Sequence, residues 1–168
     1  MKSAIKSSCC IILALVLVES IRATDWRGIT PLHSNRADVE KILGPPYGLC
    51  DSSCHYLRED VFVTITYSSP PCEANTKDRS KQWDVPSDIV VDIWVDFRGG
   101  NGPRFSTMGL DLSKYSKRRD VELGDMYYYE NNAEGVTIQM DQNFDKVRAY
   151  YYYPALKDNH LRCPPSKR

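Results

Sequence analysis

Cys50, Cys54 and His55 come closest to a known chemical motif. Haem attachment uses Cys-x-x-Cys-His, in which two thioethers hold the porphyrin and the histidine ligates the iron. Here three residues, and not two, separate the cysteines, so the thioether geometry is lost. A thioredoxin-type redox site likewise needs Cys-x-x-Cys at the start of a helix. The spacing therefore favours a local disulfide followed by a strand that holds His55.

The stretch 141–145 (Asp-Gln-Asn-Phe-Asp) imitates the first five positions of a calcium-binding loop. Such a loop needs glycine at its sixth position and glutamate at its twelfth. This chain has Lys146 and Tyr152 there. Because these polar residues also lie between two expected strands, we interpret them as a hairpin turn.

Two aspartates and three histidines are the remaining candidates for acid–base catalysis. Asp92 and Asp96 share one face of an expected strand, about 13–14 Å apart, whereas paired glycosidase carboxylates need about 5–5.5 Å, or at most about 9.5 Å. His33, His55 and His160 occur without a Gly-x-Ser-x-Gly, phosphate-loop or His-Glu-x-x-His motif. The sequence therefore assigns no catalytic residue, no cofactor and no metal ligand.

Residues 1–23 have the three-part layout of a secretory signal peptide. Two lysines come first, an apolar core follows at Cys9–Val18, and a polar exit with small residues ends the segment. The core is about half of the roughly 20 residues that a membrane-spanning helix needs. Its two cysteines lie at its beginning, where a lipoprotein signal would place one at its end. We expect cleavage after Ala23, with Ser20 as the alternative, and a secreted or periplasmic protein.

The remaining 145 residues, 24–168, suit one exported domain with its own core. Removal of the signal takes three of the 22 basic and one of the 22 acidic residues. The domain then has 19 basic and 21 acidic residues, a net charge near −2. Nucleic-acid binding needs a strongly basic surface, so we expect no nucleic-acid partner.

Four cysteines remain in that domain, and an even number in an exported chain predicts two disulfides. Three connectivities exist for Cys50, Cys54, Cys72 and Cys163. The closest pair, Cys50–Cys54, can close across a short turn-forming stretch, which leaves Cys72–Cys163. We favour this pairing, and the two crossed pairings stay open. An oxidising compartment also disfavours structural zinc at Cys50, Cys54 and His55.

Residues 34–43 are predicted to form a helix. Ser34 or Asn35 can cap its first turn, and three apolar residues at i, i+3 and i+4 form a narrow stripe. Gly44 and two following prolines end the helix.

Alternating or β-branched runs predict five strands, rich in tyrosine toward the C-terminus. These strands are expected at 61–67, 88–97, 126–130, 135–140 and 146–153. The pattern indicates an α+β fold: a mostly antiparallel sheet of five or six strands, one short helix on one face, and two disulfides. Residues 68–87 are expected to be a loop, 104–125 a loop or short helix, and 154–168 an irregular tail.

A binding face is predicted from Trp94, Tyr150 and Tyr152. Lys146 and Arg148 must face water, so alternation puts Tyr150 and Tyr152 on the same side of their strand. Trp94 shares the charged side of the strand 88–97. Aromatic side chains inside a polar rim are typical of interface hot spots. The alternative is that these rings cover one another or are covered by another segment.

Several stretches resemble a group of uncharacterised exported bacterial proteins: Trp26–Pro46, Tyr67–Cys72, Leu110–Tyr115 and His160–Cys163. That group implies no activity. Residues 34–46, where a valine-containing helix runs into Leu-Gly-x-Pro, are also similar to the helix entry of the SmpA/OmlA family. This second resemblance implies a small helical layer on an antiparallel sheet and a role as an envelope-assembly subunit. The lipid-bearing cysteine of that family is absent here.

The leading functional hypothesis is a non-enzymatic envelope or secreted module that binds a protein or a small ligand, without a membrane span. The alternative is an enzyme of unrecognised type. A pocket with convergent polar groups and a perturbed titratable residue would favour the enzyme. A flat aromatic face would favour the binding module.

The disulfide assignment gives a prediction about stability. Cys72→Ala should lower the melting temperature more than Cys54→Ala, because it opens a loop of roughly 90 residues instead of a very short one. Thermal unfolding followed by circular dichroism measures both losses. Equal losses would contradict this entropic ranking.

Overall fold

The computed structural model describes residues 25–58, 61–72, 82–122 and 124–165. The predicted signal peptide, residues 1–23, lies outside these ranges. No helix within them is both long enough and apolar enough to cross a membrane.

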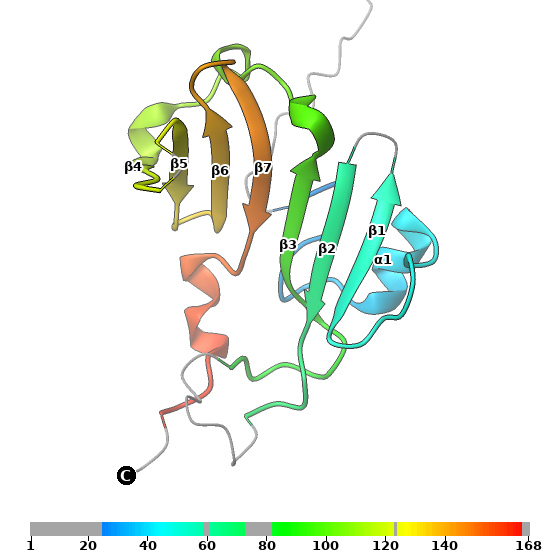
Figure 1. Ribbon diagram of the computed structural model, residues 1–168. Helices are drawn as coiled ribbons and strands as arrows, with labels where there is room; N and C mark the ends of the chain where they lie inside the picture. Colours follow the sequence, from blue (N-terminus) through cyan, green and yellow to red (C-terminus); the bar gives the residue numbers. More distant parts are fainter. Residues whose placement is uncertain (1–24, 59–60, 73–81, 123, 166–168) are drawn as a thin grey trace, which may run out of the picture.

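The described residues form a seven-stranded antiparallel sheet (Figure 1). Its spatial order is β1-β2-β3-β7-β6-β5-β4. Two meanders, β1-β2-β3 and β4-β5-β6-β7, therefore meet where β3 pairs with β7. The strands are β1 Ser53–Arg58, β2 Val61–Tyr67, β3 Val90–Phe97, β4 Ser116–Arg119, β5 Met126–Asn131, β6 Val136–Asp141 and β7 Lys146–Tyr152.

The prediction of a mostly antiparallel sheet with one helix is confirmed, but the sheet has seven strands and not five or six. Beyond the five strands with predicted ranges, the sheet has its two edges: β1, the strand expected to hold His55 but given no bounds, and β4, which was not predicted. All four residues of β4 are exposed, and three of them are basic, so no apolar alternation marks it. Such short charged edges protect a sheet against pairing with other chains. In β1 only Cys54 and Tyr56 are buried. Two buried positions form too short an alternation to define the bounds of a strand.

The α-helix α1, Arg36–Leu43, begins with a capping box. The Asp38 N–H donates to the Asn35 side chain (3.0 Å), and the Asn35 N–H donates to the Asp38 carboxylate (2.9 Å). This exchange satisfies two otherwise unpaired amides. The helix buries Val39 and Leu43 and ends at Gly44, whose φ is 70°.

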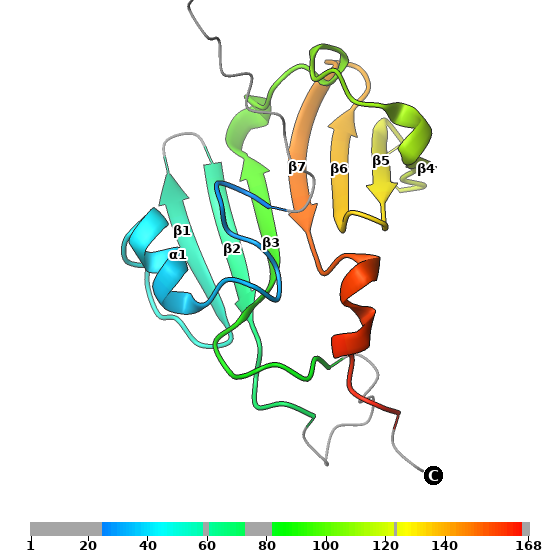
Figure 2. The ribbon, with the colours of Figure 1, turned by 180° about the vertical axis from the view of Figure 1, so that it is seen from behind.

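One face of the sheet holds the main hydrophobic cluster, and we call it the core face (Figure 2). The chain before α1 and α1 itself lie over β1, β2 and β3. Residues 101–115 lie over the other half, where the ring centroids of Phe105 and Tyr129 are 4.4 Å apart and the Tyr150 hydroxyl donates to Met108 Sδ (3.6 Å). Figure 1 looks onto the opposite, outer face, where no described segment crosses β2, β3 or β7.

A smaller apolar cluster closes one end of the sheet. It contains Leu32, Trp83 and Val85, with Leu161 packed against them. Leu161 belongs to a 3₁₀ helix, Leu156–Leu161, in the tail that the sequence predicted to be irregular. Nearby, Cys72 and Cys163 form a disulfide with a Cα–Cα distance of 5.5 Å.

Candidate functional site

The outer face carries an aromatic band, which we define as His55, Phe62, Trp94 and Tyr151. His55 stacks on Phe62 with ring centroids 5.2 Å apart. Trp94 faces Tyr151 across the β3–β7 ladder, with centroids 6.1 Å apart and planes inclined by only 12°. All four side chains are half-buried. The band therefore remains accessible across four neighbouring strands, β1, β2, β3 and β7.

The predicted binding face of Trp94, Tyr150 and Tyr152 does not exist as one surface. Tyr150 and Tyr152 are 6% and 2% exposed and belong to the core, next to Val95 and Ile93 in the β3–β7 register. Trp94 points to the outer face with Tyr151. The prediction identified the correct strands and the wrong tyrosines.

A β-bulge in β7 explains the error. Gln139 pairs with Ala149 and Met140 pairs with Val147, so Arg148 is an extra residue without its own partner on β6. Such a bulge interrupts the two-residue alternation, and the residues after Arg148 change sides. Arg148 is held by the buried Asp141 carboxylate, which its Nη2 approaches to 2.8 Å.

Two carboxylates flank Trp94 on the outer face. Asp92, Trp94 and Asp96 alternate along β3 and form a row that we call the acidic row. Burial raises the pKa of Asp92, although a hydrogen bond from Thr66 acts in the opposite direction. Within the described ranges neither carboxylate has an ion-pair partner. The buried Nε1 of Trp94 also lacks a described hydrogen-bond partner. The row therefore presents negative charge on both sides of an indole ring.

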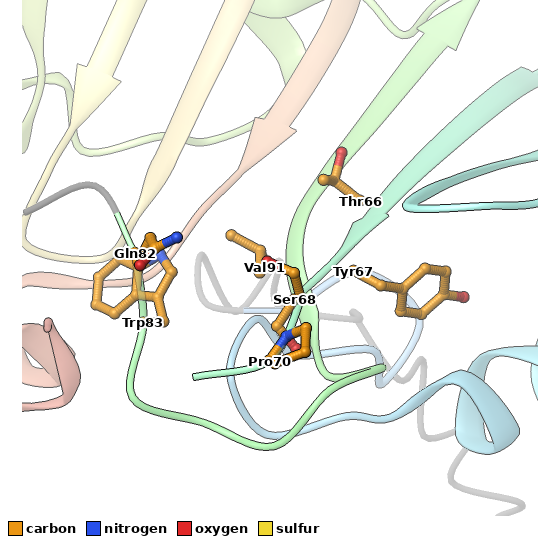
Figure 3. Close-up of a pocket in the computed structure, with 8 residues that line it drawn as sticks. Thr66, Tyr67, Ser68, Pro70, Gln82, Trp83 and Val91 are labelled. Atoms are coloured by element: carbon orange, nitrogen blue, oxygen red, sulfur yellow. The ribbon is translucent and has the colours of Figure 1, made fainter. Parts of the chain in front are cut away.

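A hollow of about 150 Å³ lies at the end of β2 (Figure 3). Ser68 and Pro70 form one side, Gln82 and Trp83 face them, and Val91 lies between. The Tyr67 ring points away from the hollow. The described lining offers hydroxyl, amide and apolar groups but no carboxylate, imidazole or thiol.

The other residues singled out in the sequence do not converge. His33 lies 3.5 Å from Asp158, whereas His160 is close to the carbonyl of Lys157. The described residues contain no group of three or more histidine, cysteine, aspartate or glutamate side chains placed to hold a metal.

The calcium-like stretch 141–145 forms the turn between β6 and β7. Asp145 accepts hydrogen bonds from the Ser106 hydroxyl (2.5 Å) and amide (3.0 Å), and these bonds lower the pKa of Asp145. This carboxylate fastens the 101–115 segment to the sheet.

The structure pairs Cys50 with Cys54, in addition to Cys72 with Cys163. These are the pairs that the sequence favours. Sequence reasoning missed Arg36, whose Nη1 lies 2.6 Å from Cys50 Sγ and 3.0 Å from Cys54 Sγ. No local pattern could have revealed it, because the cation and the sulfurs come from separate segments.

No protein-family model, no curated protein and no solved structure matches this chain. The resemblance to envelope-assembly proteins therefore stays a prediction.

The bulge predicts an order of stability effects among adjacent tyrosines. Tyr152→Ala should lower the free energy of unfolding by about 3–5 kcal/mol, as expected for a large buried ring. Tyr151→Ala should cost roughly half of that or less, because the ring is only partly removed from water. Urea unfolding of the two variants measures the difference. A larger loss for Tyr151→Ala would show that the faces are assigned wrongly.

The raised pKa of Asp92 predicts a pH effect. The unfolded chain releases this proton near the ordinary value of 3.8, and the folded protein releases it at higher pH. Between these two pKa values the folded state binds more protons than the unfolded state. The contribution of Asp92 to the free energy of unfolding therefore falls as pH rises. Asp92→Asn should therefore gain stability relative to wild type between pH 3 and pH 7 in urea unfolding. A constant difference between the two proteins would contradict this.

Proposed function

We propose that this protein is an exported, non-enzymatic binding module that contacts a partner protein through the outer face of its sheet. Two disulfides and the signal-like residues 1–23 support export. The aromatic band supports a macromolecular partner, because small-molecule sites are usually enclosed and concave. Trp and Tyr are enriched among the residues that dominate binding energy at interfaces.

The acidic row indicates the chemistry of that partner. Tryptophan is the best aromatic acceptor for a cation above its ring, and here a carboxylate lies on either side of it. Since Asp92 and Asp96 have no described ion-pair partner, a bound cation would gain attraction without breaking an existing pair. The partner is therefore a protein segment that presents lysine or arginine side chains. The row Asp92–Trp94–Asp96 on an uncovered face is the observation that carries this proposal.

A defined peptide tests it. In ¹H–¹⁵N spectra the three tryptophans give three indole signals, and Trp94→Phe identifies the one from Trp94. A capped hexa-arginine peptide should shift the Trp94 signal in a saturable way, whereas hexa-glutamate should not. The double variant Asp92→Asn/Asp96→Asn should weaken hexa-arginine binding by about tenfold or more, a loss typical of one good charged contact.

Asp84→Asn/Asp125→Asn is the matched control, because it removes two exposed carboxylates outside the row and gives the same net charge. This variant should bind like the wild type. An unperturbed Trp94 signal would contradict the proposal. Equal weakening in both double variants would also overturn it, because binding would then follow net charge alone.

A further inference from the structure

The Cys50–Cys54 disulfide lies beside a cation from a separate part of the chain. Arg36 is the first residue of α1, and its Nη1 contacts both sulfurs, at 2.6 Å and 3.0 Å. Its Nη2 donates to the carbonyl of Asp51 (2.9 Å) inside the disulfide loop. The same guanidinium is paired with Asp88 (2.8 Å) and lies over the Tyr67 ring, 4.3 Å from the centroid. The cation is therefore held in place by five residues outside its own helix.

The two sulfurs differ in access. Cys54 is completely buried on the core face of β1, whereas Cys50 is half-buried and precedes the exposed residues Asp51 and Ser52. An attacking thiolate can therefore approach Cys50, and Cys54 would be the leaving group. A thiolate at a buried position is costly unless a cation or hydrogen-bond donor compensates it. Arg36 is positioned to supply that compensation.

We propose that Cys50–Cys54 is a thiol–disulfide exchange site that accepts electrons from a dithiol. One thiolate of the dithiol attacks Cys50 Sγ, the Cys50–Cys54 bond breaks, and its electron pair leaves on Cys54 Sγ beside Arg36. The second thiol of the dithiol, after losing its proton, attacks its own sulfur in the mixed disulfide and releases Cys50. Two electrons pass to the protein, which holds two reduced cysteines, and the dithiol becomes a disulfide.

Arg36 and Asp88 act on this equilibrium in opposite directions. A cation beside the sulfurs stabilises the thiolate, and stabilising the reduced form makes a disulfide more oxidising. Asp88 partly neutralises that cation through its ion pair. The Cys-x-x-x-Cys spacing does not match a thioredoxin site, but this mechanism depends on Arg36 and not on a helix start at the cysteines. The proposed exchange site is independent of the outer face, because Cys54 belongs to the core cluster and Cys50 packs against that cluster.

The test uses the oxidised protein equilibrated with mixtures of reduced and oxidised dithiothreitol. Free thiols are then alkylated, and peptide mass spectrometry measures each disulfide separately. Cys50–Cys54 should open at a lower ratio of reduced to oxidised reagent than Cys72–Cys163. Arg36→Met should lower the equilibrium constant for reduction of Cys50–Cys54 by about tenfold. Arg36→Lys, which keeps the charge, should recover part of that loss.

Asp88→Asn tests the opposite change, the removal of the carboxylate that partly neutralises Arg36. Residue 88 has a φ of 64°, a conformation that asparagine tolerates well, so the variant should keep its fold. Removing the carboxylate should raise the same equilibrium constant above the wild-type value. The proposal is overturned if both disulfides open together or if Arg36→Met leaves the constant unchanged. Should Arg36→Met fail to fold, an unchanged constant in Asp88→Asn overturns it alone.

Discussion

The pairing of β3 with β7 is the interaction on which the rest of the structure depends. It joins two meanders that would otherwise be separate small sheets. On its core side Ile93 and Val95 face Tyr152 and Tyr150, all of them buried. On its outer side the same ladder brings Tyr151 against Trp94. One pair of strands therefore builds both the centre of the core and the centre of the candidate interface.

The two faces differ because only one of them receives a covering layer. Burial of apolar side chains beneath α1 and residues 101–115 supplies most of the driving force for this arrangement. The outer face instead combines partly exposed rings with threonines and carboxylates, a mixture that remains soluble and can still bind. Both edge strands carry features that hinder pairing with another chain. β4 is basic and exposed, and on β1 the His55 carbonyl accepts a hydrogen bond from the Tyr47 amide (2.6 Å). These features disfavour edge-to-edge pairing, and in the proposed function association uses the outer face instead.

Local sequence patterns predicted the elements whose formation depends on neighbouring residues in the chain. The β-branched run 61–67 is β2, and Gly44 ends α1 as expected. The outer-face site could be predicted only in part: Trp94 is correctly placed, whereas the partner tyrosine is Tyr151. A bulge depends on how two strands pair. The seven residues of β7 contain no local signal that Arg148 will have no partner on β6. The position of Arg36 over a distant disulfide is a tertiary contact of the same kind.

The identity of the ring that faces Trp94 tests the central claim most directly. Nuclear Overhauser contacts between assigned aromatic protons report which rings lie together in solution. The structure predicts contacts between Trp94 and Tyr151, and separate contacts between Tyr150 and Phe97, whose ring centroids are 5.4 Å apart. Contacts from Trp94 to the rings of Tyr150 and Tyr152 would show instead that β7 keeps its alternation, and both the bulge and the outer-face site would then be wrong.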